Sequence, residues 1–110
     1  MTAIISRDGL YRYGLQRSTN ALLCTCHKPV LFIGVNPSTA DADTDDATIR
    51  KMTGFAERWG FSNFMVGNVF AYRATDVREL AQVEDPVGHG NYEYLQQLML
   101  SYTTELREFK

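Results

Sequence analysis

Short apolar runs alternate along this chain with longer segments in which apolar residues recur every three or four positions. Two runs are almost entirely apolar, VLFIGV at 30–35 and FMVGNVFA at 64–71. Such runs are typical of central strands that are covered on both faces, as in a parallel sheet. Pro37 cannot donate to a β ladder and biases Asn36 towards an extended conformation. We therefore predict two buried strands, the first of which ends at Asn36.

The segment between these two strands has helical periodicity. Asp45 or Asp46 is placed to cap the first turn, and Gly60 stands where a glycine commonly ends a helix. Gly54 lies inside the helix at a cost of about 1 kcal/mol against alanine, which predicts close packing at that point. A strand, a helix and a strand form a βαβ unit with a right-handed crossover. The predicted apolar face of the helix consists of Ile49, Met52, Ala56 and Trp59.

An N-terminal hairpin and two further helices complete the predicted elements. Asp8-Gly9 separates the short runs 4–6 and 10–16, which is a strong hairpin signal, and 21–26 reads as another short strand. A short helix at 77–82 follows Thr75 or Asp76 as its cap, and a last helix begins at Asn91. The apolar stripe of that helix consists of Tyr92, Leu95, Met99, Tyr102 and Leu106.

These elements predict an α/β fold. We expect a small sheet with a central parallel βαβ unit, the N-terminal β-hairpin at an edge, and helices packed on the faces. The chain of 110 residues is 45% hydrophobic, which suits a single domain over 1–110 with a real core.

The net charge and the absence of long apolar runs limit the classes of function that the sequence allows. With 11 basic and 13 acidic residues the net charge is -2, and no basic tract is present, so sequence-independent binding to duplex DNA is not expected. No apolar run approaches the roughly 18 residues of a membrane span. Met1–Ile5 does not read as a signal peptide, because it runs straight into Arg7-Asp8. We therefore expect a cytoplasmic protein without membrane association.

The candidate chemistry lies in two polar loops that follow the predicted strands. Ligands of open parallel sheets bind at the carboxyl ends of the strands, and the loops 36–41 and 72–76 leave those ends. Arg73 offers a forked cation for phosphate or carboxylate. The alternative is that Asn36 and Ser38 only close a turn and that Thr75 only caps a helix. The predicted ligand-binding residues are Ser38, Thr39, Asp41, Asn68, Arg73 and Thr75.

Asn68 interrupts an apolar run, FMVGNVF. A buried amide that finds no partner costs about 1–3 kcal/mol. One interpretation is that the backbone of a neighbouring loop satisfies this amide. The other is that Asn68 is a polar group at the floor of the ligand crevice.

Metal and acid–base chemistry have weaker signals. The acidic run 41–46 begins like an EF-hand loop, but Asp46 replaces the glycine at position six and Met52 replaces the glutamate at position twelve. A looser Mg²⁺ site and a solvated loop both stay open for this run. Cys24-Thr25-Cys26-His27 lacks the usual spacing of structural zinc ligands. We therefore expect no cofactor and assign no metal-ligating residue.

Asp85 and His89 lie in one loop and form a candidate acid–base pair. The alternative is that this loop simply turns on Pro86, Gly88 and Gly90.

The order of these motifs resembles the bacterial and phage family called domain of unknown function 1643. That family has no established activity, so the resemblance implies a fold and a signature without a reaction. Members usually continue into a further strand and a late His-Pro segment, so the resemblance implies a shortened chain, whose uncovered apolar edge we expect a homodimer to cover. In place of a proline-and-acid pair this chain has His89-Gly90. The matching stretches are 11–13, 32–41, 45–50, 54–56, 59–60, 68–75, 85–88 and Asn91.

A shorter stretch, Gly34-Val35-Asn36-Pro37, is similar to the G-x-N-P-G motif of mismatch-specific uracil-DNA glycosylases. In those enzymes the asparagine orients a water and the flipped base enters the pocket. Ser38 replaces the last glycine, and the second motif has no counterpart. This similarity implies a candidate catalytic role for Asn36. The first hypothesis is a nucleotide- or nucleobase-binding protein with a glycosylase-like crevice, and the second is a non-catalytic binding or accessory protein that keeps the fold.

Overall fold

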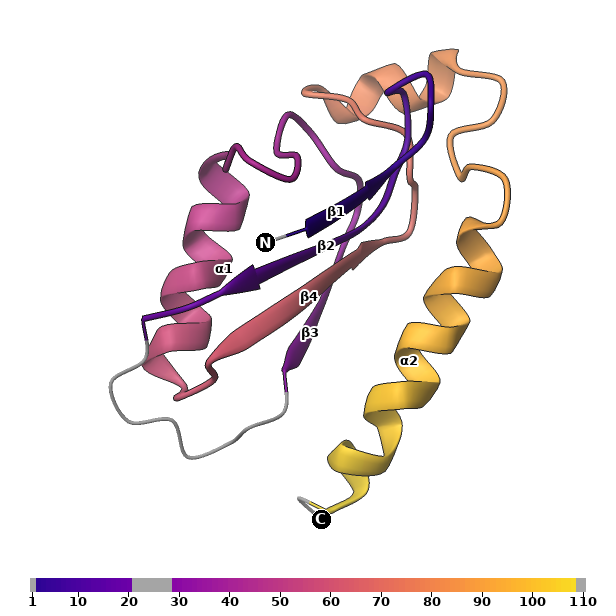
Figure 1. Ribbon diagram of the computed structural model, residues 1–110. Helices are drawn as coiled ribbons and strands as arrows, with labels where there is room; N and C mark the ends of the chain where they lie inside the picture. The colour runs from indigo at the N-terminus through magenta and orange to yellow at the C-terminus, as the bar shows by residue number, and fades with distance from the viewer. Residues whose placement is uncertain (1, 21–28, 109–110) are drawn as a thin grey trace.

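A four-stranded mixed sheet forms the centre of the molecule (Figure 1). The computed structural model describes residues 2–20 and 29–108. The strands are β1 (Thr2–Ile5), β2 (Arg12–Ser18), β3 (Val30–Gly34) and β4 (Asn63–Asn68), in the order β1-β2-β4-β3. β3 and β4 are parallel, and the other two pairings are antiparallel. The predicted α/β fold, with a parallel βαβ unit and the N-terminal hairpin at an edge, is confirmed.

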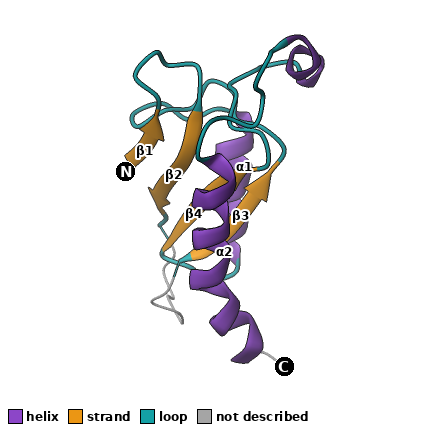
Figure 2. Ribbon diagram, turned by 90° about the vertical axis from the view of Figure 1, so that its right-hand side faces the viewer, coloured by secondary structure: helices purple, strands orange, loops and turns teal. Residues whose placement is uncertain are grey.

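Helices cover both faces of this sheet, as the two perpendicular views show (Figures 1 and 2). Helix α1 (Ala47–Arg58) connects β3 to β4, and α2 (Asn91–Glu108) lies on the opposite face. Asp46 is the N-cap of α1, since its Oδ1 accepts from the backbone N–H of Ile49 at 3.0 Å. Gly60 follows the helix with a positive φ of 84°. Both predicted ends of this helix are confirmed.

The main core lies between α1 and the sheet. Its buried members come from β2, α1, β4 and the loop before α1, and they are Leu15, Ala40, Ile49, Ala56, Phe64 and Val66. On the other face, α2 approaches the backbone of the sheet closely. A Cβ on Gly67 would lie 2.8 Å from Leu95 Cδ1, so the glycine makes room for this helix.

The prediction that both apolar runs form strands covered on both faces is right only for β4. Within the described part of the chain β3 is an edge strand, and Ile33 is 45% exposed. β2 pairs with β4 rather than with β3, and an apolar run does not reveal on which side the next strand adds. β4 also ends at Asn68, before the predicted end at Ala71.

Two packing predictions for the helices are wrong. A Cβ on Gly54 would meet no atom within 4 Å, so this glycine does not mark close packing. In α2, Tyr92 and Met99 of the predicted apolar stripe are 65% and 47% exposed, whereas Leu95 of the same stripe packs against Gly67. Asn91 sets this rotation, because its buried side chain donates to the carbonyls at the end of β4.

The remaining predicted elements have mixed outcomes. Asp76 caps a short helix, η1 (Val77–Gln82), as predicted, although it is a 3-10 helix. Trp59 is exposed but stacks on Phe32 and on Phe55. The predicted strand at 21–26 and the side chains of Tyr102 and Leu106 lie outside the described part.

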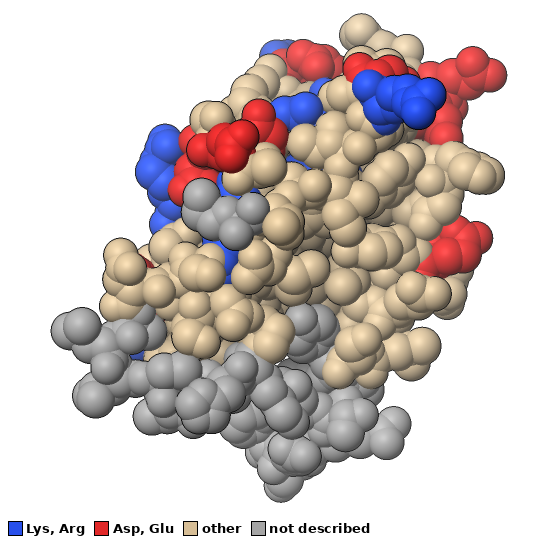
Figure 3. Space-filling model, viewed as in Figure 1, with Lys and Arg blue, Asp and Glu red and all other residues tan. Residues whose placement is uncertain are grey.

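The surface carries charges of both signs. On the face seen in Figure 3, acidic and basic side chains gather beside one another at the end of the molecule where the loops lie. None of the described helices is long and apolar enough to cross a membrane. The homodimer stays a prediction, and light scattering over a series of protein concentrations would test it.

Candidate functional site

The loops that follow the two parallel strands meet at the carboxyl end of the sheet. The backbone N–H of Ala74 donates to Pro37 O at 2.9 Å, and Phe70 N–H donates to Val35 O at 2.8 Å. The side-chain Nδ2 of Asn36 donates to Ala74 O at 2.9 Å. The prediction that both loops open on the same rim is therefore confirmed, and the two loops are directly bonded to each other.

Three arginines hold the loop between β3 and α1 by its carbonyl oxygens. Arg73 donates to the carbonyls of residues 38 and 39, each at 3.0 Å. Arg12 Nη1 donates to that of residue 40 at 3.0 Å, and Arg17 Nη2 donates to that of residue 41. Four consecutive carbonyls thus bind guanidinium groups from β2 and from the loop after β4. Hydrogen bonds to charged donors are about twice as strong as neutral ones, so this loop is firmly placed.

The carboxylates of the acidic run are bound by the chain itself. Asp45 accepts from Arg17 Nε at 2.8 Å, and Asp46 Oδ2 accepts from Ala40 N–H at 3.3 Å. Asp41 accepts from two backbone N–H groups, those of Asp43 and residue 44, and these bonds hold the pKa of its carboxyl below the ordinary value of 3.8. Within residues 2–20 and 29–108 no three His, Cys, Asp or Glu side chains group as metal ligands would. Cys24, Cys26 and His27 lie outside the described residues.

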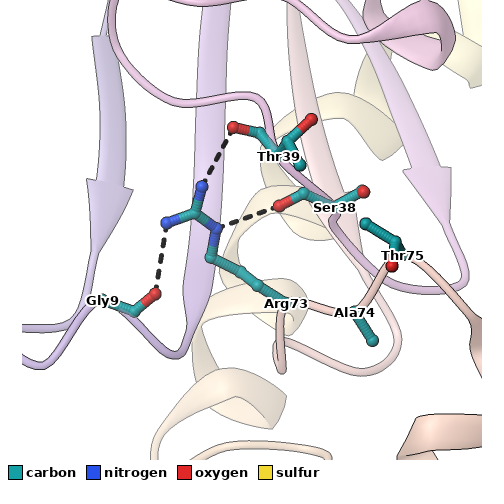
Figure 4. A pocket seen from close by; sticks show the side chains of 6 residues that line it. All are labelled: Gly9, Ser38, Thr39, Arg73, Ala74 and Thr75. Atoms are coloured by element: carbon teal, nitrogen blue, oxygen red, sulfur yellow. Dashed lines mark hydrogen bonds between the residues drawn. The ribbon is translucent and has the colours of Figure 1, made fainter.

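One cavity, here called the outer cavity, opens beside Arg73. It has a volume of about 330 Å³ and is lined by Gly9, Ser38, Thr39, Arg73, Ala74 and Thr75. Figure 4 shows the guanidinium of Arg73 directed at three carbonyl oxygens, the third being that of Gly9 at 3.2 Å. Three of its five N–H donors are therefore used within the chain. The first role of Arg73 is to join the hairpin to both loops, and its role in ligand binding stays a prediction.

A second cavity, here called the inner cavity, lies between the first turns of α1 and the carboxyl ends of β3 and β4. Its volume is about 240 Å³. Both polar and apolar residues line it. The polar members are Arg12, Asn36, Ser38, Asp46, Thr48 and Asn68. The other members are Gly34, Val35, Pro37, Ile49, Met52 and Val66.

Two deeply buried polar side chains of the inner cavity have unused hydrogen-bonding capacity. Arg12 is 3% exposed, and its Nε has no hydrogen-bond partner in the described part of the chain. Asn68 is 4% exposed, and no hydrogen bond of its side-chain amide is seen among the described residues. Burial lowers the pKa of the Arg12 guanidinium to about 10, while the carboxylate of Asp46 opposes this shift. Arg12 therefore remains a cation at neutral pH.

Asn36 has a fixed orientation in the same cavity. Its Nδ2 donates to the carbonyls of Pro37 and Ala74, at 3.0 and 2.9 Å. Because only the amide nitrogen can donate to two carbonyls, these bonds assign the orientation of the amide. They leave Oδ1 as an acceptor held in one place.

The structure divides the predicted site residues between the two cavities. Asn36 and Asn68 line the inner cavity, Thr39, Arg73 and Thr75 line the outer one, and Ser38 lines both. Asn68 lies in the lining of the inner cavity, and its role towards a ligand stays a prediction.

Three predicted residues line neither cavity: Asp41, Asp85 and His89. Asp85 Oδ1 accepts from the N–H of Gly88 at 3.1 Å, as expected of a residue that closes a turn. His89 is exposed. The candidate acid–base pair therefore lies outside both cavities.

Sequence reasoning missed Arg12, Asp46 and Thr48 as members of the inner cavity. Arg12 lies inside an aromatic-rich strand, and this position could have indicated that the residue is buried. A buried arginine needs hydrogen-bonding partners or a ligand, so it could have been considered as a site residue. Asp46 and Thr48 had no separate signal, because the sequence explains them as residues of a helix start.

A comparison with known families covers most of the chain. The family model described as "Protein of unknown function (DUF1643)" matches residues 12–105, a range that contains every residue of both cavities except Gly9. No curated protein and no solved structure matches the chain. The protein therefore belongs to the family described as Protein of unknown function (DUF1643).

Proposed function

We propose that this protein binds a small, planar, polar molecule of nucleobase size in the inner cavity, either as a free base or as part of a nucleotide. One observation carries the proposal. Asn68 and its neighbour in the lining, Arg12, are almost completely buried, and the side-chain amide of Asn68 has no hydrogen bond within the described chain. Buried polar groups are nearly always paired, so a ligand that pairs with them is the simplest account of their placement.

The size and lining of the cavity support a ligand of this class. Its volume of about 240 Å³ lies just below the roughly 300–1,000 Å³ of sites for drug-sized ligands, which suits one small ring system. Ile49, Met52 and Val66 provide apolar surface that can pack on the faces of a ring. The side-chain amides of Asn36 and Asn68 can form hydrogen bonds with its edges. Arg12 and Asp46, the charged members of the lining, have opposite signs, so a neutral ring is favoured over an ion.

Binding without a reaction is the function that the geometry supports best. Both carboxylate oxygens of Asp46 accept backbone N–H groups, and Asp85 and His89 lie outside the cavity. No described carboxylate or histidine is therefore placed to act as a general base there.

Removal of a base from its sugar is the second candidate function. The observation that favours it is the fixed Oδ1 of Asn36, an acceptor suited to hold a water at the cavity. Chromatography that follows the release of free base from nucleosides, nucleotides or uracil-containing DNA tests this candidate. The wild-type protein is compared in this assay with the variant Asn36→Asp.

A titration of the ¹⁵N-labelled protein with uracil, cytosine, adenine and their nucleoside 5′-monophosphates tests the binding proposal. We expect amide shifts on both sides of the cavity, at Gly34, Ile49 and Asn68, for at least one of these compounds. Thr48 is exposed and lines the cavity, so Thr48→Trp should block it and abolish the shifts.

Lys51→Trp is the matched control for this variant. Lys51 lies on the same helix and is exposed, but it does not line the inner cavity. Binding should survive in this control. Binding that survives equally in Thr48→Trp, or shifts that map away from the cavity, would overturn the proposal.

A further inference from the structure

We infer that the ligand of the inner cavity carries a hydrogen-bond donor next to an acceptor on one edge, and that the side-chain amide of Asn68 reads this edge. This inference rests on the proposed function and deepens it, since it states which edge the ligand must present.

The amide of Asn68 is directed at the cavity and has no other partner within the described chain. The residue is only 4% exposed and lines the inner cavity, and no hydrogen bond of its side chain is seen among the described residues. An amide presents an acceptor oxygen beside a donor nitrogen. The amide therefore meets whatever fills the cavity, whether water or a ligand.

Hydrogen bonds hold the backbone of Asn68 in place and so fix the point from which its amide extends. Asn68 is paired with Gly34 across the parallel strands, and its own carbonyl accepts from Asn91 Nδ2 at 3.0 Å. A Cβ on residue 34 would lie 2.8 Å from Asn68 Nδ2, so the amide lies directly against the backbone of β3. The glycine at the end of β3 thus creates the space that the amide occupies.

An amide selects a ligand edge by complementarity. It forms two parallel hydrogen bonds with a lactam or amidine edge, which also has one donor beside one acceptor, as asparagine does with adenine. Uracil, cytosine and adenine all have such an edge. A carboxylate at the same position would instead select two adjacent donors, because it only accepts.

The test uses 1-methyluracil, 1-methylcytosine and 9-methyladenine, because blocking the ring nitrogen that carries the sugar in nucleosides removes the second donor–acceptor edge of each free base. Each is compared with a derivative whose remaining edge donor is also methylated: 1,3-dimethyluracil, N4,N4,1-trimethylcytosine and N6,N6,9-trimethyladenine. In the wild-type protein we expect methylation to weaken binding about tenfold or more, in line with the value of a bidentate pair. Asn68→Leu should bind the base and its methylated derivative equally. Asn68→Asp should bind the base with an affinity lower by a similar factor. The same variant should bind benzamidinium, a planar cation with two adjacent donors, more tightly than the wild-type protein does.

Asn63→Asp is the matched control, since Asn63 begins the same strand and lies outside the cavity. This variant should keep the preferences of the wild-type protein. If Asn68→Leu fails to fold, Gly34→Ala displaces the same amide, and it should likewise abolish the discrimination against the methylated derivative.

The two proposals fail in different ways. If no base binds the wild-type protein, the proposed function itself is overturned. If a base binds in the cavity but its methylated derivative binds equally well, and Asn68→Asp leaves this unchanged, only the role of Asn68 is overturned.

Discussion

Gly34 and Asn68 are partners across the parallel strands β3 and β4, and a Cβ on residue 34 would lie only 2.8 Å from the Nδ2 atom of Asn68. The glycine therefore gives the buried amide its place in the inner cavity. The contact is with the end of a side chain rather than with backbone, so a larger residue there displaces the amide and leaves the sheet intact.

Gly34→Ala should destabilise the protein by about 1 kcal/mol, at the lower end of the cost of overpacking, because the atom it displaces is the end of a side chain beside a cavity. The melting temperature, followed by circular dichroism, should fall by several degrees. The spectrum of the folded variant should match that of the wild-type protein, because the sheet pairing is unchanged. An unchanged melting temperature would show that the amide moves aside without cost.

Gly54→Ala should have the opposite effect. A Cβ at this helical position meets no atom within 4 Å, and alanine is about 0.5–1 kcal/mol better than glycine inside a helix. We expect the urea midpoint to rise with no change in the slope of the transition. A lower midpoint would mean that residue 54 is more crowded than the structure indicates.

Arg17→Met should be strongly destabilising, because it removes the guanidinium that binds Asp45 and the carbonyl of Asp41. Loss of one partner of a buried ion pair costs about 3–5 kcal/mol, and we expect a value near the lower end because the Asp45 carboxylate reaches solvent. Equilibrium unfolding in urea measures this difference. Arg78→Met is the control: its ion pair with Asp76 lies on the surface, so no measurable change is expected.

Asp41→Asn should change how stability depends on pH. Bonds from the backbone N–H groups of Asp43 and then Thr44 lower the pKa of Asp41 below 3.8 in the folded protein. The ionised carboxylate therefore stabilises the folded state at pH values above 3.8, and this contribution is lost as the pH falls below that value. The amide of the variant does not titrate, so the variant should be less stable than the wild-type protein at about pH 5, and the difference should shrink at about pH 3. Urea midpoints at the two pH values provide the measurement, and a constant difference would contradict it.

The predictions that succeeded depend on local chemistry. The N-cap at Asp46, the positive φ of Gly60 and the hairpin turn at Asp8-Gly9 follow from a few neighbouring residues. The meeting of the two loops followed from the general rule for parallel strands. Such features are predictable because each depends on a short stretch of chain.

The features that the sequence did not predict depend on contacts between distant segments. Arg12 belongs to the inner cavity because β2 pairs with β4, a strand far along the chain, rather than with β3. The face that α2 turns to the sheet depends on Asn91, whose side chain bonds to the end of β4. The periodic pattern predicts that a helix forms, but the hydrogen bonds of Asn91 determine which side of the helix faces the sheet.

The arginines that bind four successive carbonyls of the loop before α1 have a consequence for recognition. Because this loop is already rigid, it loses little conformational entropy when a ligand binds beside it. More of the free energy of the contacts therefore remains as binding affinity. Free and occupied forms should then differ by less than about 1 Å in this stretch, as in other preorganised complexes. The ligand would then bind to a preformed site without rearrangement of this loop.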